Sequence, residues 1–576
     1  MSYLVSSING VIHSAGLSLH PSNRLSSAEN SQEILSGTYS PLKILPGRKM
    51  PPVPEQNITL LESWIQGCLK NHPKCQTEDV PLLPKRVIDI GTSPADEITL
   101  HETNSQRAFY TALSHQWGKS QLLTTTSTTL SSRKSQIPWH SLSLTFQDAI
   151  TLTRLLGVRY LWIDSLCIIQ DDPMDWAIES AKMADVYSNS YVTISANTST
   201  GILLGPSTTR KHQSQHLETV EASRSKVPLV LRHPNSHIQF FASSMMESVG
   251  RADQDLDAGY PLFKRAWCFQ ERFLATRILH FTDGEVVFEC KSACDCECGG
   301  VLNEKYLKGR FASLMDRSRS GKPRGKYEMS MWDGWMAIVN QYVRKDITYP
   351  TDILPALAGM AGRVDCEELG RYVAGLWEKC LPQGIFWFAH VSSCDRAGLE
   401  KSTAPAPTFS WASLAGTAKA NEITWPYALE KGEAKQLFDI VDIICEVGTH
   451  NPYGLVTRGS LRLGGYLLEV AVKARKGPAP FNCVIRCGGH EYGARFFMDR
   501  VIMSDLTTER DFLCFFGFQR NELSNPRDRK EDEADFCVLL LEMVEKGIYR
   551  RVGCGPFFVV DRSWLERASH QEFSLI

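Results

Sequence analysis

The sequence lacks a long apolar run. No stretch reaches the roughly 18 uninterrupted apolar residues that a membrane helix needs, and the run around Leu161 is broken by Asp164. The first residues include Ser, Asn and His, and they do not form a basic segment followed by an apolar one. We therefore expect no membrane span, no secretory signal and a cytoplasmic location.

An excess of charge of one sign is also missing. The 62 basic and 64 acidic residues leave a formal net charge of −2, so the chain as a whole is not attracted to nucleic acid or anionic lipid, and we expect no nucleic-acid partner. The sequence has no P-loop, no Gly-x-Gly-x-x-Gly after a strand and no His-Glu-x-x-His helix. The absence of a glycine loop for phosphates disfavours a kinase, an ATPase or a dehydrogenase.

The length of the chain exceeds what one hydrophobic core usually supports. Its 576 residues, 43% of them apolar and 22% charged, are typical of a globular protein with two or three domains. Changes in composition predict four regions. They are a loosely ordered leader over residues 1–55, an α/β domain over 56–310 with its core at about 109–290, a helical extension over 311–420 and a β-rich C-terminal domain over 421–576.

The 17 cysteines are scattered and odd in number, which favours reduced thiols over a disulfide framework. The densest group is Cys290, Cys294, Cys296 and Cys298, and thiolates at this spacing could hold zinc. The group lacks the paired Cys-x2-Cys spacing of standard zinc modules, so it is a weak candidate. Cys68, His72 and Cys75 form a second, smaller candidate set. No cofactor is required by the sequence.

The chemistry-bearing region alternates strands and helices. An apolar strand is predicted over Phe109 to His115, an amphipathic helix over Ser143 to Leu156, and a second strand over Val158 to Ile163. Asp172 and Pro173 begin the next helix, and Tyr191 to Ala196 is a third strand. This order predicts a doubly wound α/β domain with a parallel sheet.

Polar residues follow the predicted strands directly. His115 to Trp117, Asp164 to Cys167, and Asn197 stand at strand ends, where open α/β sheets bind ligands. On the helix that holds Arg265 to Leu274, Trp267 and Glu271 are one turn apart and would share a face. We expect these groups to gather on one rim of the sheet.

Three ordered blocks carry a family resemblance. They are Tyr110 to Gly118, Tyr160 to Asp172 and Arg265 to Leu274, which contain Leu-Ser-x-x-Trp-Gly, Trp-Ile-Asp-Ser-x-Cys-Ile-x-Gln-Asp and Arg-x-Trp-x-x-Gln-Glu-Arg. Together they resemble the fungal heterokaryon incompatibility (HET) domain family. The resemblance implies a TIR-like fold and a role in non-self recognition and cell death after fusion of unlike individuals.

The resemblance also implies a chemistry. In TIR domains a Trp-Cys-x-x-Glu segment carries the glutamate that cleaves the nicotinamide glycosidic bond of NAD, and Trp267 to Glu271 has this spacing. NAD would then be a substrate and not a cofactor. We expect Glu271 and Asp164 as catalytic residues, and the substrate-binding residues would be Ser114, His115, Trp117, Ser165, Arg265 and Trp267. His115 departs from the family, since an aromatic residue such as Tyr is usual there.

Each of these residues could instead have a purely structural role. Glu271 could form an ion pair with Arg265 or Arg272 that fixes its helix, Asp164 could accept backbone amides at a turn, and the tryptophans could be core residues. At the level of the whole protein, a non-catalytic module that assembles with itself or with an incompatibility partner is one alternative. An enzyme of fungal secondary metabolism is another.

Overall fold

The computed structural model describes residues 43–44, 55–76, 79–117, 123–197, 230–232, 240–241, 261–282, 286–296, 307–321, 329–391, 406–415, 420–426, 434–448, 451–474, 482–499, 506, 508–520 and 533–576. The chain divides into two compact units. One spans Met1–Gly47 and Ser225–Ser243, and its described part is an antiparallel sheet of β1 (Lys43–Ile44), β7 (Val230–Arg232) and β8 (Phe240–Phe241). Most of the predicted leader lies outside the described residues. The other unit spans Arg48–Arg224 and Ser244–Ile576 and holds the rest of the described chain.

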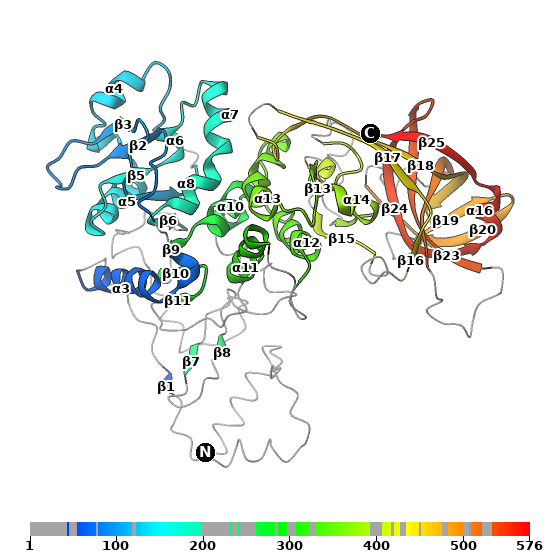
Figure 1. Ribbon diagram of the computed structural model, residues 1–576, viewed down its shortest axis with the longest axis horizontal. Coiled ribbons are helices and arrows are strands. Elements are labelled where there is room, and N and C mark those ends of the chain that lie inside the picture. Colours follow the sequence, from blue (N-terminus) through cyan, green and yellow to red (C-terminus); the bar gives the residue numbers. More distant parts are fainter. Residues whose placement is uncertain are drawn as a thin grey trace, which may run out of the picture. The chain divides into compact units, whose positions relative to one another are not determined.

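An eight-stranded mixed sheet forms the centre of the α/β region (Figure 1). In sheet order its strands are β11 (Cys294–Cys296), β10 (Val286–Cys290), β9 (Arg277–Phe281), β6 (Val192–Ala196), β4 (Tyr110–Ser114), β5 (Tyr160–Trp162), β2 (Arg86–Asp89) and β3 (Thr99–Glu102). The four central strands β9, β6, β4 and β5 are parallel, as predicted.

The two edges of this sheet differ from the prediction. Strands β10 and β11 on one side, and β2 and β3 on the other, are all antiparallel to their neighbours. The physical reason is the length of the connections. Only residues 282–285 join β9 to β10, whereas a parallel neighbour needs a crossover of a dozen or more residues. The sheet is therefore parallel at its core and antiparallel at its edges.

Helices connect the parallel strands and are bounded by the predicted signals. Ser143 caps the helix over Leu144–Leu155 by accepting from the amide of Phe146. Gly157, at φ +70°, stands just after the end of that helix. Asp172 caps the helix over Pro173–Ala181 by accepting from the amides of Met174 and Asp175. The helical elements of this region are α3 (Glu55–Asn71), η1 (Pro73–Cys75), α4 (Leu130–Ser135), η2 (Trp139–Ser141), α5 (Leu144–Leu155), α6 (Asp164–Cys167), α7 (Pro173–Ala181), α8 (Met183–Asn189), η4 (Pro261–Lys264) and α10 (Ala266–Leu274).

The order of the parallel strands creates a switch point. The chain runs from β4 to β5 on one side and then to β6 and β9 on the other side of β4. In open α/β sheets such a reversal leaves a crevice at the carboxyl ends of the strands whose connections diverge. Here these strands are β4 and β6, which end at Ser114 and Ala196 and pair in register there, Ser114 opposite Ser195.

A helical region rich in tryptophan follows the sheet. It contains α11 (Leu307–Ser320), α12 (Met331–Tyr342), η5 (Pro350–Asp352), η6 (Pro355–Leu357), α13 (Ala358–Val364), β12 (Tyr372–Val373), β13 (Leu376–Trp377), η7 (Glu378–Cys380), α14 (Leu381–Gly384), β14 (Phe388–Val391), η9 (Trp411–Leu414) and β15 (Ala420–Thr424). Phe269 and Phe273 of α10 are buried in the same core as Trp335 and Trp377. The apolar face of helix α10 therefore packs against this core, and its opposite face points away from the core.

The C-terminal part is rich in β-structure, as predicted. Its strands are β16 (Ala434–Gln436), β17 (Asp439–Val447), β18 (Val456–Ala474), β19 (Asn482–Cys487), β20 (His490–Arg495), β21 (Phe497–Met498), β22 (Arg510–Arg520), β23 (Glu533–Glu545), β24 (Ile548–Asp561) and β25 (Ser569–Leu575), with the short helix α16 (Ser563–Arg567). Strand β18 pairs with β25 along its first half and with β22 along its second half. Strands β22, β23, β24 and β25 pair in turn, so the five form a closed ring.

Strand β23 of this ring is buried on both of its faces over Ala534 to Leu541. Val538 and Leu540 of β23 belong to one apolar core, whereas Leu539 and Leu541 belong to another. Alternate side chains of a strand point to opposite faces, so an unbroken apolar run is what a strand buried on both sides requires. Within the described residues, no helix combines the length and the apolar character that crossing a membrane would take.

Candidate functional site

Asp164, which follows strand β5, brings several of the predicted rim residues together. Its Oδ2 accepts a hydrogen bond from the indole N–H of Trp117 at 2.8 Å, and its Oδ1 accepts from the backbone amide of Ser165 at 2.7 Å. The same Oδ1 lies 3.8 Å from Nδ1 of His115. The bond from the Ser165 amide is the structural role that the sequence also allowed for Asp164. Asp164 has this bond and in addition contacts Trp117 and His115, which both follow strand β4.

His115 is a buried imidazole at the end of β4. Its ring meets Phe146 edge to face with centroids 5.2 Å apart, and its backbone carbonyl accepts a hydrogen bond from Arg265 at 3.2 Å. Burial lowers the pKa of the imidazole, and this outweighs the attraction to Asp164. The ring is therefore neutral near pH 7.

Glu271 lies on α10 with only 6% of the residue exposed. Its carboxyl group receives hydrogen bonds from the hydroxyl of Ser114 and the thiol of Cys268. Burial is the main cause that raises the pKa of this carboxyl group, to about 7. The nearby Asp164 carboxylate acts in the same direction, whereas Ser114 and the Arg265 guanidinium act in the opposite direction. A carboxyl group in this state changes its charge at neutral pH.

The predicted alternative for Glu271, an ion pair with a neighbouring arginine, is not what the described residues show. Arg272 pairs with Glu289, donating from Nε and Nη2 at 3.0 Å each. Arg265 donates to the carbonyl of His115 and acts on Glu271 only through its charge at a longer range. Among the described residues, no guanidinium is thus bound to the buried Glu271 carboxylate.

Trp267 is placed differently from the expectation that it shares a pocket with Glu271. Its indole N–H donates to Oδ2 of Asp352 at 3.0 Å, and its ring packs edge to face on Trp176 with centroids 6.2 Å apart. The two side chains lie one turn apart on α10, but their partners are different. Trp117, by contrast, is 40% exposed beside Asp164.

Several buried polar atoms of this rim have no hydrogen-bond partner in the described part of the chain. They are Nδ1 and Nε2 of His115, Oγ of Ser165, Oδ1 of Asn197 and Oε2 of Glu271. Buried polar atoms are nearly always paired, with protein or with ordered water, because an unpaired one costs about 1–3 kcal/mol. Donors and acceptors without partners are what a site for a polar ligand presents.

Two residues near Glu271 were not predicted as part of the site. Cys268 stands one turn before Glu271, and burial raises its thiol pKa well above the usual value. Tyr187 of α8 donates to the carbonyl of Leu113 at 3.2 Å, and burial and the Glu271 charge raise its pKa. The spacing of three residues from Glu271 was a signal for Cys268. Tyr187 comes from another helix, so no local pattern indicated it.

The predicted group of four cysteines is divided by the structure. Cys290 lies with Cys68, His72 and Cys75, whose potential ligand atoms are all within 4.8 Å of one another. Cys294 is buried on the neighbouring strand β11, with its backbone opposite Glu289. The side chain of Cys296 and all of Cys298 lie outside the described residues. The smaller predicted set is therefore the one that the fold brings together.

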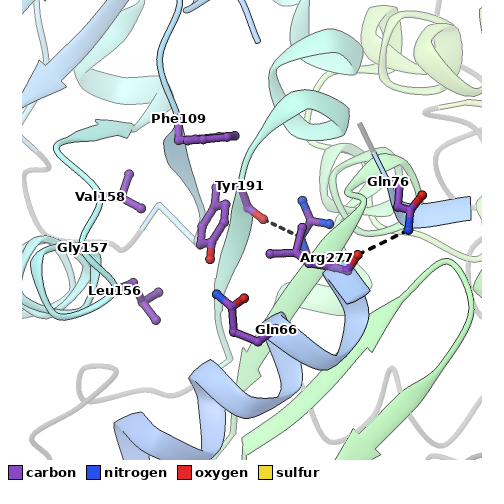
Figure 2. Close-up of a pocket in the computed structure, with 9 residues that line it drawn as sticks. Gln66, Gln76, Phe109, Leu156, Gly157, Val158, Tyr191 and Arg277 are labelled. Carbon is purple, nitrogen blue, oxygen red and sulfur yellow. Dashed lines mark hydrogen bonds between the residues drawn. The ribbon is translucent and has the colours of Figure 1, made fainter. Parts of the chain in front are cut away.

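A cavity of about 460 Å³ opens at the other edge of the sheet, where the parallel strands begin (Figure 2). Phe109, Val158, Tyr191 and Arg277 line it from the starts of β4, β5, β6 and β9. The Arg277 guanidinium is its charged group and is already bound to the carbonyls of Tyr191 and Cys75. Among the described residues that line the cavity, Tyr191 adds a phenol to this guanidinium, and the lining includes no carboxylate, imidazole or thiol.

Comparison with known proteins gives one finding. Residues 110–271 match the family model described as "Heterokaryon incompatibility protein (HET)", and the match runs from the first residue of β4 to Glu271. Neither the curated proteins nor the solved structures gave a match. All eight predicted site residues lie between these two bounds. Residues 110–271, which carry the candidate rim, are therefore similar to heterokaryon incompatibility (HET) domains.

Proposed function

We propose that this HET domain acts in fungal non-self recognition and cell death by hydrolysing the nicotinamide glycosidic bond of NAD. The observation that supports this most directly is the Glu271 carboxyl group, which is buried at the switch-point rim and ionised only around neutral pH. No guanidinium in the described part of the chain is bound to it. Perturbed carboxyl groups in such a position are candidates for catalysis. The likeness to TIR domains belongs to the same proposal, and it rests on the Trp267 to Glu271 spacing and on the β5-β4-β6-β9 order.

Hydrolysis of the nicotinamide glycosidic bond requires little from the protein beyond one negative charge. The bond between the ribose anomeric carbon and the nicotinamide nitrogen breaks, and nicotinamide leaves as a neutral molecule with the bonding electrons, so no general acid is needed. The ribose passes through a state that resembles an oxocarbenium ion. Water then adds to the anomeric carbon and releases a proton, giving ADP-ribose. The ionised Glu271 would stabilise the positive charge that develops on the ribose.

The other rim residues would position the substrate. Trp117 is exposed and has its indole N–H bound to Asp164, so its ring is held at one angle and could stack on nicotinamide. Asp164, beside the Ser165 amide, would accept ribose hydroxyls. The uncommitted nitrogens of the neutral His115 and the Arg265 charge next to it would receive polar and anionic parts of the dinucleotide.

Replacement of Glu271 by Gln tests the proposal. Because Gln has the same size but no charge, we expect the variant to release nicotinamide from NAD at least about 100-fold more slowly than the natural protein. The measurement is chromatographic separation of nicotinamide and ADP-ribose after incubation with the purified full-length chain. Glu378→Gln, which removes an acid that is 42% exposed at its side chain, is the matched control and should retain the full rate. Equal rates for Glu271→Gln and the natural protein would disprove the role of Glu271.

The pH dependence of the reaction is a separate expectation. Only the ionised carboxylate stabilises a positive ribose, and the Glu271 pKa is about 7, so kcat/KM should rise about tenfold per pH unit below pH 7 and level off above it. The groups that face Glu271 do not reverse this sign. His115 and Cys268 are held in their neutral forms by burial, and so is the phenol of Tyr187. A rate that falls as the pH rises from 6 to 8 would contradict the assignment.

Cell death through loss of NAD would connect the chemistry to the family. We propose that the trigger is association of the chain with itself or with an incompatibility partner, which brings the domain into its active state. Expression of Glu271→Gln in a fungal host separates the two mechanisms. Survival of the host supports killing by hydrolysis, whereas unchanged death with an inactive site would identify a non-catalytic assembly module.

A further inference from the structure

A cluster of sulfur and nitrogen atoms lies at the edge of the sheet opposite to the candidate rim. Cys68 is in the last turn of α3, Cys75 is the last residue of η1, His72 stands between them, and Cys290 ends strand β10. Their potential ligand atoms all lie within 4.8 Å of one another, and Nδ1 of His72 is 3.3 Å from Sγ of Cys290. The three cysteines are buried at 1% exposure or less.

We propose that Cys68, His72, Cys75 and Cys290 form a structural Zn²⁺ site that ties helix α3 to strand β10. Three thiolates and one imidazole are among the ligand sets of structural zinc. A tetrahedral ion with Zn–S bonds of about 2.3 Å sets its sulfur ligands roughly 3.8 Å apart, which the spacing of these atoms accommodates. Four protein ligands leave no open position for a substrate, so the site would be structural and not catalytic.

The surroundings of the cluster resemble the outer shell of a metal site. The backbone amides of Ser292 and Ala293 point at Sγ of Cys290, at 3.4 and 3.2 Å. The turn that presents them is closed by a hydrogen bond from the Cys290 amide to the Ala293 carbonyl at 2.8 Å. Amides that donate to sulfur stabilise a thiolate and fix its direction, and they are typical of the groups around metal ligands. A protonated cysteine that only packs in a core does not require two amide donors to its sulfur.

The local sequence explains why the first three ligands converge. Cys68 and His72 are four residues apart, and the His72 amide donates to the Cys68 carbonyl at 3.1 Å, so both side chains leave the same side of the helix end. Pro73 begins η1, and the Cys75 amide donates back to the His72 carbonyl at 2.9 Å. The chain thus turns back on itself within three residues and returns Cys75 to the side of Cys68.

The fourth ligand closes a long connection. Cys290 is 218 residues after His72, and the same contact region is held by the stacking of Trp64 on Phe288 with ring centroids 6.1 Å apart. Arg277 donates to the carbonyl of Cys75 at 2.9 Å. It also donates to the carbonyl of Tyr191 at 2.8 Å (Figure 2), so it links this cluster to the start of β6. Zinc here would fasten an N-terminal helix to the antiparallel edge of the sheet, and its binding energy would add to the stability of the fold.

The metal content of the full-length chain tests the proposal without any assay of activity. Protein made and purified under reducing conditions without chelators should contain a single zinc ion per chain by plasma mass spectrometry. Replacement of that ion by Co²⁺ should give the visible absorption of a tetrahedral cobalt thiolate. Removal of the metal with a strong chelator should lower the melting temperature, and added zinc should restore it. A folded natural protein that contains no zinc and does not respond to zinc or chelator would overturn the proposal.

Variants identify the ligands. Cys290→Ser should lower zinc affinity by more than about 100-fold, since loss of an outer-shell partner alone costs 10-fold to 100-fold. Cys294→Ser is the matched control, because it removes a buried cysteine four residues away that lies outside the cluster, and it should keep its zinc. His72→Cys offers a fourth thiolate and should also keep the metal, with a changed cobalt spectrum, which guards against variants that only fail to fold. Equal loss from Cys294→Ser, or a disulfide among Cys68, Cys75 and Cys290 in the native protein, would disprove the assignment.

Discussion

Glu289→Gln is expected to lower the free energy of unfolding by about 3–5 kcal/mol, because the variant leaves buried positive charge without its counter-ion. Glu289 of β10 is 1% exposed and binds Arg272 of α10 through both of its oxygens. It also lies 3.1 Å from Nε2 of His280 on β9. The fully buried Lys308 of α11 donates to the carbonyl of Arg272, and the Glu289 charge counteracts the burial that lowers the Lys308 pKa to about 8. One carboxylate thus binds the sheet to α10 directly and acts on Lys308 of α11 through its charge.

Urea denaturation of the two proteins at pH 7 measures this effect. Glu542→Gln is the control, because Glu542 pairs with Arg510 and Arg550 at the surface and such pairs contribute about 1 kcal/mol or less. Combining Glu289→Gln with Lys308→Met removes a buried cation together with the carboxylate, and part of the lost stability should return. A cost below about 1 kcal/mol for Glu289→Gln would show that water reaches the Arg272 guanidinium.

The sign of the pH dependence provides a second check on the same residue. Arg272 and Lys308 hold the Glu289 pKa well below its usual value against the effect of burial. A carboxyl group with a lowered pKa in the folded state stabilises the protein above the pKa of the unfolded chain, and this contribution is lost as the pH falls. The difference in stability between the natural protein and Glu289→Gln should therefore shrink below about pH 4.

Much of the α/β region could be predicted because its signals are local. A cap such as Ser143 or Asp172 and the period of apolar residues fix the bounds of a helix from a few neighbouring positions. The rim followed from these elements, since parallel strands end at the same edge of a sheet. The structure accordingly brings His115, Trp117 and Asp164 together, as the prediction required.

What could not be predicted depends on partners far away in the sequence. Trp267 and Glu271 have the spacing of a shared face, yet Trp267 turns to Asp352, 85 residues later. Nothing within the helix specifies that acceptor. Cys290 was grouped with the cysteines that follow it, but the hairpin of β10 and β11 leaves Cys294 on another strand and the fold supplies Cys68, His72 and Cys75 instead. The antiparallel edges of the sheet were missed for a related reason, since short connections between apolar strands were not recognised as hairpins.

Glu271→Gln is expected to make the protein more stable at pH 8, by up to about 3 kcal/mol, although it removes the carboxylate from the candidate site. The Glu271 pKa is about 7 in the folded protein against an ordinary value of 4.5, and each pKa unit corresponds to about 1.4 kcal/mol. A carboxyl group with a raised pKa contributes its stability below the pKa of the unfolded chain and loses it as the pH rises through the folded value. At pH 8 the natural protein therefore carries a buried charge at Glu271, whereas the side-chain amide of the variant at this position is neutral.

Urea denaturation at pH 8 and at pH 5 distinguishes the cost of the buried Glu271 charge from a structural role of this side chain. The gain from Glu271→Gln should be largest at pH 8 and should shrink to about 1 kcal/mol or less at pH 5, where the natural carboxyl group is protonated in the fold. Glu289→Gln should be destabilising at both values, since that carboxylate has its partners. A loss of stability at pH 8 for Glu271→Gln would mean that the fold itself satisfies the charge, and the reason to place chemistry there would disappear. A gain at pH 8 together with lost nicotinamide release would identify a carboxylate kept against the stability of the fold, which only a function explains.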